Sequence, residues 1–236
     1  MAKLEVSFSP DLFEFYRNDD AIVVVIDIFR ATTAMTTAFD NGVKSIIPVK
    51  TVEEAKEYQA KGFIAAAERQ GQIVDGFELG NSPFHYMDAK TKGKDVVLTT
   101  TNGTRAISIA EGAYSIVIGS FNNLTAVCDL LNNSKRDVLL LCAGWKGRYN
   151  LEDSLFAGAV VNKIQGELFN ELSDSAVAAN HMYETSKGDL DSFLANSSHR
   201  RRLGKLNLEE DIKYCLKTDT TSVVPVLKGD RLVSMK

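Results

Sequence analysis

Cysteine and histidine are scarce in this sequence. Only three cysteines occur, at Cys128, Cys142 and Cys215. They form no CxxC pair, and an odd, scattered set fits a reducing compartment better than a disulfide framework. The three histidines are His85, His181 and His199. They show no paired spacing, which argues against a zinc site.

Long apolar runs and a strong charge of one sign are also lacking. The N-terminus, MAKLEVSFSP, has no apolar segment of signal-peptide length, and no apolar run is long enough to span a bilayer. The formal net charge of −4 over 236 residues argues against a nucleic-acid partner. We therefore predict a cytoplasmic protein with neither a membrane nor a nucleic-acid partner, and a homo-oligomer is compatible with this sequence.

What the sequence contains is an ordinary globular composition, 44% hydrophobic and 25% charged, with enough apolar material for a full core. Short apolar segments alternate with helical patterns along the chain. The strand-like segments are AIVVVID, SIIPV, FIAAA, DVVLTT, YSIVIG and DVLLLCAG. Strands that are apolar throughout and separated by helices predict a mostly parallel sheet covered on both faces. We predict an α/β fold, a three-layer α/β/α arrangement with a largely parallel or mixed sheet.

No low-complexity linker divides the chain, so we predict one domain over residues 1–236. Within it, residues 174–217 are more polar and are predicted to be mainly helical. Residues 221–235 are predicted to form a C-terminal β-hairpin around Lys-Gly-Asp.

The first polar cluster follows the most apolar strand, in AIVVVIDIFRATTAM. Ligands of open α/β sheets bind beyond the carboxyl ends of the strands, and the next helix offers N–H groups to an anion. Asp27 could hold a metal or attack phosphorus, and Arg30 could bind anionic oxygens. Thr32 or Thr33 could cap the helix and contact a phosphate. The structural alternative is a capping threonine with a surface ion pair.

A long glycine-rich segment, AERQGQIVDGFELGNSP, carries the second cluster. Extended loops of this kind are often functional. Ser82 followed by proline is also a fair helix start, which would explain Ser82 structurally. A helix start at Ser82 does not explain why two charged residues, Glu68 and Arg69, follow an apolar run. Asn81 lies beside Ser82 and is a further candidate for substrate binding.

The third cluster is TTTNGTRA, in which Thr101, Asn102 and Thr104 supply hydroxyls and an amide. Gly103 would allow a close approach of the backbone. Asn-Gly is also a common turn, so function and structure explain this segment equally well.

The fourth cluster is CAGWKGRYNLEDSLFAG. Glu152 and Asp153 suit the first turn of a helix, where acids interact well with the helix dipole. Beside the two loop glycines they would also form a good site for a hard metal ion. Lys146 in the same loop is a candidate for substrate binding. By contrast, HRRR at 199–202 is more typical of a solvated helix face than of a site, although it could bind a distal anion.

Cys142 and Arg148 have the C-x5-R spacing of cysteine-based phosphatases, in which a thiolate of low pKa attacks phosphorus. The pattern is short, and a buried, inert cysteine at the end of an apolar strand is the commoner outcome.

Taken together and in this order, DIFRATT, AERQGQIVDGFELGNSP, TTTNGTRA and CAGWKGRYNLEDSLFAG resemble the 2-phosphosulfolactate phosphatase family. The resemblance extends into SSHRRRL and the VVPVL tail. It implies a magnesium-dependent phosphatase that converts 2-phospho-3-sulfolactate to 3-sulfolactate, a step toward coenzyme M. Its matching motifs contain Asp27, Arg30, Glu68, Arg69, Asn102, Glu152 and Asp153.

We therefore expect hydrolysis of a small anionic phosphate ester with Mg²⁺. The expected catalytic residues are Asp27 and Arg30, with Cys142 in the metal-free alternative. The expected metal ligands are Asp27, Glu68, Glu152 and Asp153. The expected substrate-binding residues are Thr32, Thr33, Arg69, Asn81, Ser82, Thr101, Asn102, Gly103, Thr104 and Lys146. Attack by Asp27 and attack by metal-bound water both remain open, as does a non-catalytic anion-binding protein.

Overall fold

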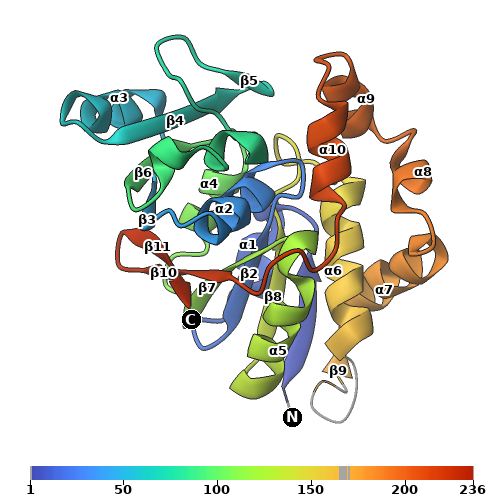
Figure 1. Cartoon of the computed structure of the whole chain (residues 1–236). Coiled ribbons are helices and arrows are strands. Elements are labelled where there is room, and N and C mark those ends of the chain that lie inside the picture. Colours follow the sequence, from blue (N-terminus) through green and yellow to red (C-terminus); the bar gives the residue numbers. More distant parts are fainter. Residues whose placement is uncertain (1, 165–168, 170, 236) are drawn as a thin grey trace.

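The computed structural model describes residues 2–164, 169 and 171–235. Figure 1 shows a long, bent sheet with helices on its faces. Its strands are β1 (Lys3–Ser7), β2 (Ile22–Ile26), β3 (Ser45–Pro48), β4 (Ile64–Arg69), β5 (Gln72–Ile73), β6 (Asp95–Thr99), β7 (Ser115–Gly119), β8 (Val138–Cys142), β9 (Glu171–Leu172), β10 (Val224–Lys228) and β11 (Arg231–Met235).

The α-helices are α1 (Phe13–Tyr16), α2 (Ala31–Asp40), α3 (Val52–Ala60), α4 (Gly103–Ile109), α5 (Leu124–Ser134), α6 (Leu151–Ile164), α7 (Asp174–Ser186), α8 (Leu190–Leu194), α9 (Ser198–Gly204) and α10 (Glu209–Cys215). Short 3-10 helices are η1 (Pro10–Leu12), η2 (Pro83–Tyr86), η3 (Ala89–Thr91) and η4 (Phe121–Asn123). Among the helices described, none combines the length and the apolar character that crossing a membrane requires.

The strand order is β5-β4-β6-β3-β11-β10-β7-β2-β8-β1-β9. β4, β6 and β3 form one parallel group, and β7, β2, β8, β1 and β9 form another. The hairpin of β10 and β11 pairs antiparallel with both groups, so the two groups run in opposite senses. The sheet is therefore largely parallel but mixed, which confirms the predicted α/β fold.

The hairpin joins the two groups through only one residue pair on each side, Val226 with Val117 and Leu232 with Ile46. Figure 1 shows β4 lying across the direction of β2 and β8. The carboxyl ends of β2 and β4 consequently meet at one site, although their groups run in opposite senses.

β2 lies between β7 and β8, and all five of its residues are buried. Val24 and Ile26 pack on the face covered by α5 and α6, while Val23 and Val25 pack in the core that contains α2 and α4. Burial on both faces explains why this strand is apolar throughout. The residue that follows it, Asp27, emerges at the carboxyl edge of the sheet.

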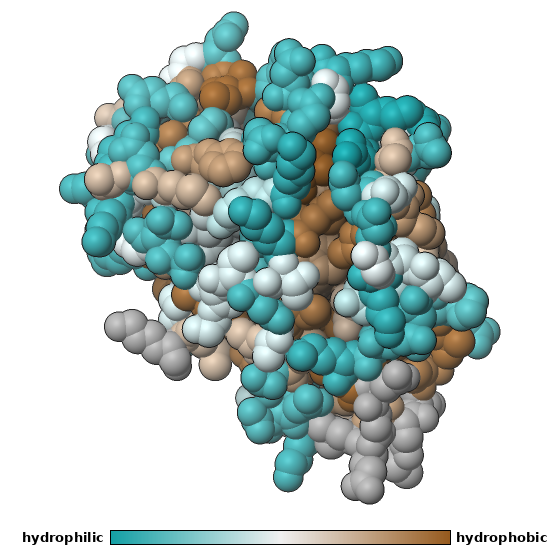
Figure 2. Space-filling model, turned by 45° about the vertical axis from the view of Figure 1, so that its right-hand side comes forward, coloured by the Kyte–Doolittle hydropathy of each residue, from teal (hydrophilic) through white to brown (hydrophobic). Residues whose placement is uncertain are grey.

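The helical segment from α7 to α10, residues 174–215, lies along one side of the sheet (Figure 1). Figure 1 shows α7 beside α6, with α8, α9 and α10 along the right-hand side of the molecule. Figure 2 shows a largely hydrophilic face on which apolar residues lie in a depression between hydrophilic ridges. Helices α9 and α10 each bring one buried polar residue, His199 and Asp211, toward the carboxyl edge of the sheet.

Candidate active site

Asp27 lies at the centre of the candidate site. Its side chain is buried, and it lines a small cavity together with Glu68, Asn102 and His199, among others. Burial raises the pKa of Asp27 to about 7; His199 opposes this rise, while Glu68 and Glu152 add to it. A charged carboxylate here is stable only if a cation or hydrogen-bond donors compensate it.

The turn after Asp27 is held together by two threonine hydroxyls. Thr32 Oγ1 accepts a hydrogen bond of 3.1 Å from the Asp27 N–H, and Thr33 Oγ1 donates one of 3.0 Å to the Ile28 carbonyl. Both side chains are fully buried. Their hydroxyls therefore shape the turn. The structure does not give Thr32 and Thr33 the phosphate-contacting position that we expected.

Glu68 reaches the same cavity from the end of β4. Its carboxylate accepts hydrogen bonds from the N–H groups of Gly71, at 2.5 Å, and Thr101, at 3.1 Å. The Thr101 hydroxyl donates to it as well. Thr101 thus positions Glu68, and the carboxylate has most of its acceptor capacity occupied by the protein.

Arg69 follows Glu68 but faces the opposite side of the strand, as successive strand residues do. Its guanidinium donates to the Glu68 carbonyl and to Thr99 Oγ1, and it lines a different cavity with Lys50 and Arg105. The structure therefore does not bring Arg69 to the Asp27 cavity, where we expected it to bind substrate.

Asp153 connects two loops at the carboxyl edge. Its two carboxylate oxygens accept hydrogen bonds from the N–H of Ile28, at 2.8 Å, and of Gly144, at 3.1 Å. Burial and the neighbouring charges of Asp27 and Glu152 raise the pKa of Asp153 well above its usual range, and the Ile28 bond opposes them. Asp153 therefore holds the turn after β2 against the loop after β8.

Glu152 lies beside Asp153 in the first turn of α6 and is fully buried. Its Oε1 is 2.5 Å from His199 Nδ1, whereas its Oε2 is buried without a hydrogen-bond partner in the described structure. Buried polar atoms are normally satisfied, so an orphaned carboxylate oxygen indicates a missing ligand or cation.

His199 and Arg202 come from α9, the segment that we had interpreted as a solvated helix face. His199 is 5% exposed and packs against the rings of Phe29 and Trp145. The Arg202 guanidinium carbon lies 3.4 Å from the centroid of the Trp145 ring. Burial lowers the pKa of Arg202, and Glu152 is the strongest of the carboxylates that oppose this effect. The interpretation of 199–202 as a solvated face was therefore wrong for His199, which is buried, whereas Arg202 is half-buried.

Arg30 is buried next to the Asp27 cavity. Its Nη1 donates to Asp211 at 2.8 Å and its Nη2 donates to the Gly71 carbonyl at 2.6 Å. Its Nε is buried without a partner in the described structure. Asp211 lies 181 positions further along the chain, and no spacing rule in the sequence connects the two.

Asn102 and Lys146 are linked through the backbone. Asn102 Oδ1 accepts a hydrogen bond of 3.2 Å from the Lys146 N–H, and Asn102 lines the Asp27 cavity. The Lys146 side chain is exposed, with Nζ 5.5 Å from the centroid of the Trp145 ring. Lys146 therefore orients Asn102 through its backbone, and the substrate contact of its side chain stays a prediction.

Gly103 makes the close approach that the sequence suggested. A Cβ at this position would lie 2.7 Å from Ala31 Cβ and 3.1 Å from Asp27 Oδ2. The next residue, Thr104, is buried and exchanges hydrogen bonds with Thr100. The turn therefore requires glycine at position 103, because a Cβ would collide with Ala31 there. The Thr104 side chain stabilises the turn itself through its hydrogen bonds with Thr100.

Asn81 and Ser82 are both 6% exposed and line a larger cavity beside Arg30. Asn81 also lines the Asp27 cavity, and its Oδ1 is buried without a partner in the part of the chain described. Ser82 precedes η2 but makes no capping hydrogen bond. The predicted helix start is therefore confirmed, with Ser82 at the N-cap and Pro83 at the first position, but the cap does not account for the Ser82 hydroxyl.

Comparison with known proteins agrees with this geometry. A family model described as 2-phosphosulpholactate phosphatase matches residues 7–230. The chain belongs to the 2-phosphosulfolactate phosphatase family. This family name describes a phosphoric monoester hydrolase, and all four polar clusters lie inside the matched range.

Several relatives are each named probable 2-phosphosulfolactate phosphatase. One from Thermotoga maritima is 45% identical over 204 residues, which cover 86% of this chain and 88% of the relative. One from Caldanaerobacter subterraneus subsp. tengcongensis is 40% identical over 211 residues, 88% of each chain. One from Clostridium botulinum strain Alaska E43 is 36% identical over 238 residues, 99% of this chain and 100% of the relative.

Cys142 does not have the surroundings of a phosphatase nucleophile. It is fully buried in the hydrophobic core, while Arg148 is exposed. Burial raises the pKa of the Cys142 thiol well above its usual value, and the nearby Asp153 adds to this. A nucleophilic cysteine needs the opposite shift and partial exposure. The metal-free alternative therefore finds no support in this geometry.

The four acids predicted to bind metal differ in the oxygens that they can offer. Glu68 and Asp153 use both of their oxygens to accept hydrogen bonds. Among the described residues no group of three or more His, Cys, Asp or Glu side chains is arranged to hold a metal ion. Mg²⁺ commonly takes one or two carboxylates and completes its shell with water and substrate oxygens. Asp27 and the orphaned oxygen of Glu152 fit that pattern.

Proposed function

We propose that this protein is a magnesium-dependent phosphatase that hydrolyses 2-phospho-3-sulfolactate to 3-sulfolactate and phosphate, a reaction on the route to coenzyme M. The observation that carries the proposal is the orphaned Glu152 oxygen among the carboxylates around Asp27, with the buried Arg30 alongside. The name shared by the relatives supports the substrate.

Asp27 and Glu152 would hold the metal. When bound, Mg²⁺ would neutralise charge on the phosphoryl oxygens and favour in-line displacement. The Glu152 carboxylate can only accept a hydrogen bond when it is ionised, so His199 donates from Nδ1 and its Nε2 is left for the cavity. Arg30 lines the same cavity, and its guanidinium charge would stabilise the anionic phosphoryl group.

We propose Asp27 as the catalytic residue, in one of two alternative roles. As a nucleophile it would bond to phosphorus, displace the sulfolactate oxygen and form an aspartyl-phosphate that water then hydrolyses. As a ligand it would orient the phosphoryl group for direct attack by water. Both routes consume one water and give the same products.

Phosphate release from a panel of phosphorylated hydroxy acids, with and without Mg²⁺, tests the proposal. We expect EDTA to abolish release from 2-phospho-3-sulfolactate and added Mg²⁺ to restore it. Full activity in EDTA would contradict the metal requirement. Saturable binding of the ester without any phosphate release would instead favour the non-catalytic anion-binding protein.

A further inference from the structure

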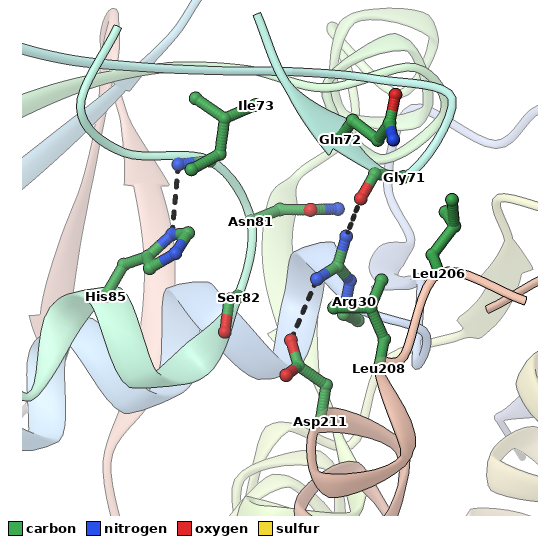
Figure 3. A pocket seen from close by; sticks show the side chains of 11 residues that line it. Arg30, Gly71, Gln72, Ile73, Asn81, Ser82, His85, Leu206, Leu208 and Asp211 are labelled. Carbon is green, nitrogen blue, oxygen red and sulfur yellow. Dashed lines mark hydrogen bonds and ion pairs between the residues drawn. The ribbon is translucent and has the colours of Figure 1, made fainter. Parts of the chain in front are cut away.

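A second cavity, of about 410 Å³, opens beside Arg30. Arg30, Gly71 and Asn81 line both this cavity and the one that contains Asp27, so the two share one wall. Figure 3 shows the second cavity, with the Arg30 guanidinium held between the Gly71 carbonyl and Asp211. Its volume is in the range of small-molecule sites.

Three polar groups on this cavity have hydrogen-bonding capacity that the described residues leave unused. Arg30 Nε and Asn81 Oδ1 are buried without partners. Ser82 occupies the cap position of η2, yet its hydroxyl makes no capping bond. Buried polar groups are normally satisfied, so this concentration of unused groups indicates a polar ligand.

His85 adds a fourth polar group. Its Nδ1 accepts a hydrogen bond of 3.0 Å from the Gly80 N–H, so a neutral ring carries its proton on Nε2. Burial, and then repulsion by Arg30, lower the pKa of His85 and favour that neutral form. His85 can therefore donate from Nε2 into the cavity that it lines.

Donors outnumber acceptors among these groups, because only Asn81 Oδ1 is restricted to accepting, and this favours a ligand group that mainly accepts. Arg30 Nε, the Ser82 hydroxyl and His85 Nε2 come from three separate positions on the cavity wall. A sulfonate presents three acceptor oxygens that point apart and carries no donor, whereas the two oxygens of a carboxylate lie in one plane. Leu206 and Leu208 also line the cavity and can contact the carbon skeleton.

We propose, resting on the function proposed above, that this second cavity binds the sulfonate of the substrate while the phosphate lies in the Asp27 cavity. Ser82 and His85 are then specificity-determining residues, and Arg30 contributes to both subsites. Asp211, paired with Arg30 at 2.8 Å, positions the guanidinium at the boundary between them.

Two variants remove donors without removing structural bonds. His85→Asn keeps a side-chain acceptor for the Gly80 N–H and removes the Nε2 donor. Ser82→Ala removes a hydroxyl that makes no capping bond. The matched control is His181→Asn, the same substitution at an exposed position on α7. Thermal melting checks that all three variants fold.

Inhibition constants are measured for 3-sulfolactate and for lactate, which lacks only the sulfonate, against turnover of 2-phospho-3-sulfolactate. We expect the preference of the wild-type enzyme for 3-sulfolactate over lactate to shrink tenfold or more in His85→Asn and Ser82→Ala, and to stay within twofold in His181→Asn. An unchanged preference in both folded variants, or none in the wild type, overturns the sulfonate assignment. Absence of wild-type turnover overturns the proposed function itself, and the assignment with it.

Discussion

Glu152 Oε1 and His199 Nδ1 lie 2.5 Å apart, although the residues are separated by 47 positions in the sequence. The bond is buried and joins the first turn of α6 to the first turn of α9. It attaches the C-terminal helices to the carboxyl edge of the sheet, next to Asp27.

Replacing His199 should therefore destabilise the fold as well as the site. In His199→Ala the Glu152 carboxylate would be left buried without its partner, and breaking a buried pair of this kind costs about 3 kcal/mol. Chemical denaturation measures the change in the free energy of unfolding. His181→Ala, at an exposed position, should change it by less than about 0.5 kcal/mol. Equal stability of His199→Ala and wild type would contradict a structural role for this bond.

Asp211→Asn tests whether Asp211 positions Arg30. The side chains are 9% and 4% exposed, respectively, so the pair is shielded from water and salt. The variant keeps a hydrogen-bond acceptor but removes the countercharge. We expect kcat/KM to fall at least about tenfold, because small displacements in an active site are costly. Glu210→Gln, which alters an exposed pair with Lys213 on the same helix, serves as the control. Wild-type kinetics in Asp211→Asn would contradict a role for Asp211 in positioning Arg30.

Cys142→Ala should lower stability and leave turnover largely intact. The side chain ends β8 inside the core, so truncation leaves a small void that costs about 1 kcal/mol. Loss of a true nucleophile would instead reduce kcat by orders of magnitude. Turnover is measured per folded molecule after denaturation curves fix the folded fraction. A folded but inactive variant would reverse our rejection of the cysteine mechanism.

Gly103→Ala should damage the site through one added methyl group. The new Cβ would meet Ala31 and the Asp27 carboxylate, and overpacking of this kind costs about 1–3 kcal/mol. We expect turnover to fall more than about tenfold, because Asp27 must shift. Gly188→Ala, where a Cβ meets no atom within 4 Å, should be silent. Similar activity in the two variants would show that the close approach at Gly103 is dispensable.

The sheet and Asp27 were predictable from sequence for one physical reason. A strand buried on both faces must be apolar throughout. The first carboxylate after such an apolar run, here Asp27, therefore marks the end of the strand in the sequence. The same reasoning placed Glu68 and Asn102 at strand ends, and the structure puts both on the Asp27 cavity. A buried, inert cysteine was also the commoner expectation at the end of an apolar strand, and Cys142 is buried in this way.

His199 and Asp211 were not predictable in this way. Each belongs to a short, charged helix, and charged helical segments are usually solvated. Their burial depends on how the C-terminal helices pack against the sheet, which local periodicity does not encode. The structural role of Thr32 and Thr33 was not predictable for the opposite reason, because their own turn uses the hydroxyls that looked available to a ligand.

Turnover by Asp27→Asn tests the central claim most directly. The substitution keeps the shape and removes the charge of a side chain that is 5% exposed. We expect a folded protein whose phosphate release from 2-phospho-3-sulfolactate with Mg²⁺ is lower by several orders of magnitude. Trapping during wild-type turnover separates the two roles: a mass increase on the Asp27 peptide identifies a nucleophile, and weaker Mg²⁺ binding by the variant without an adduct in the wild type identifies a ligand. Near-normal turnover by Asp27→Asn would contradict the account, because Asp27 would then be only the end of a strand.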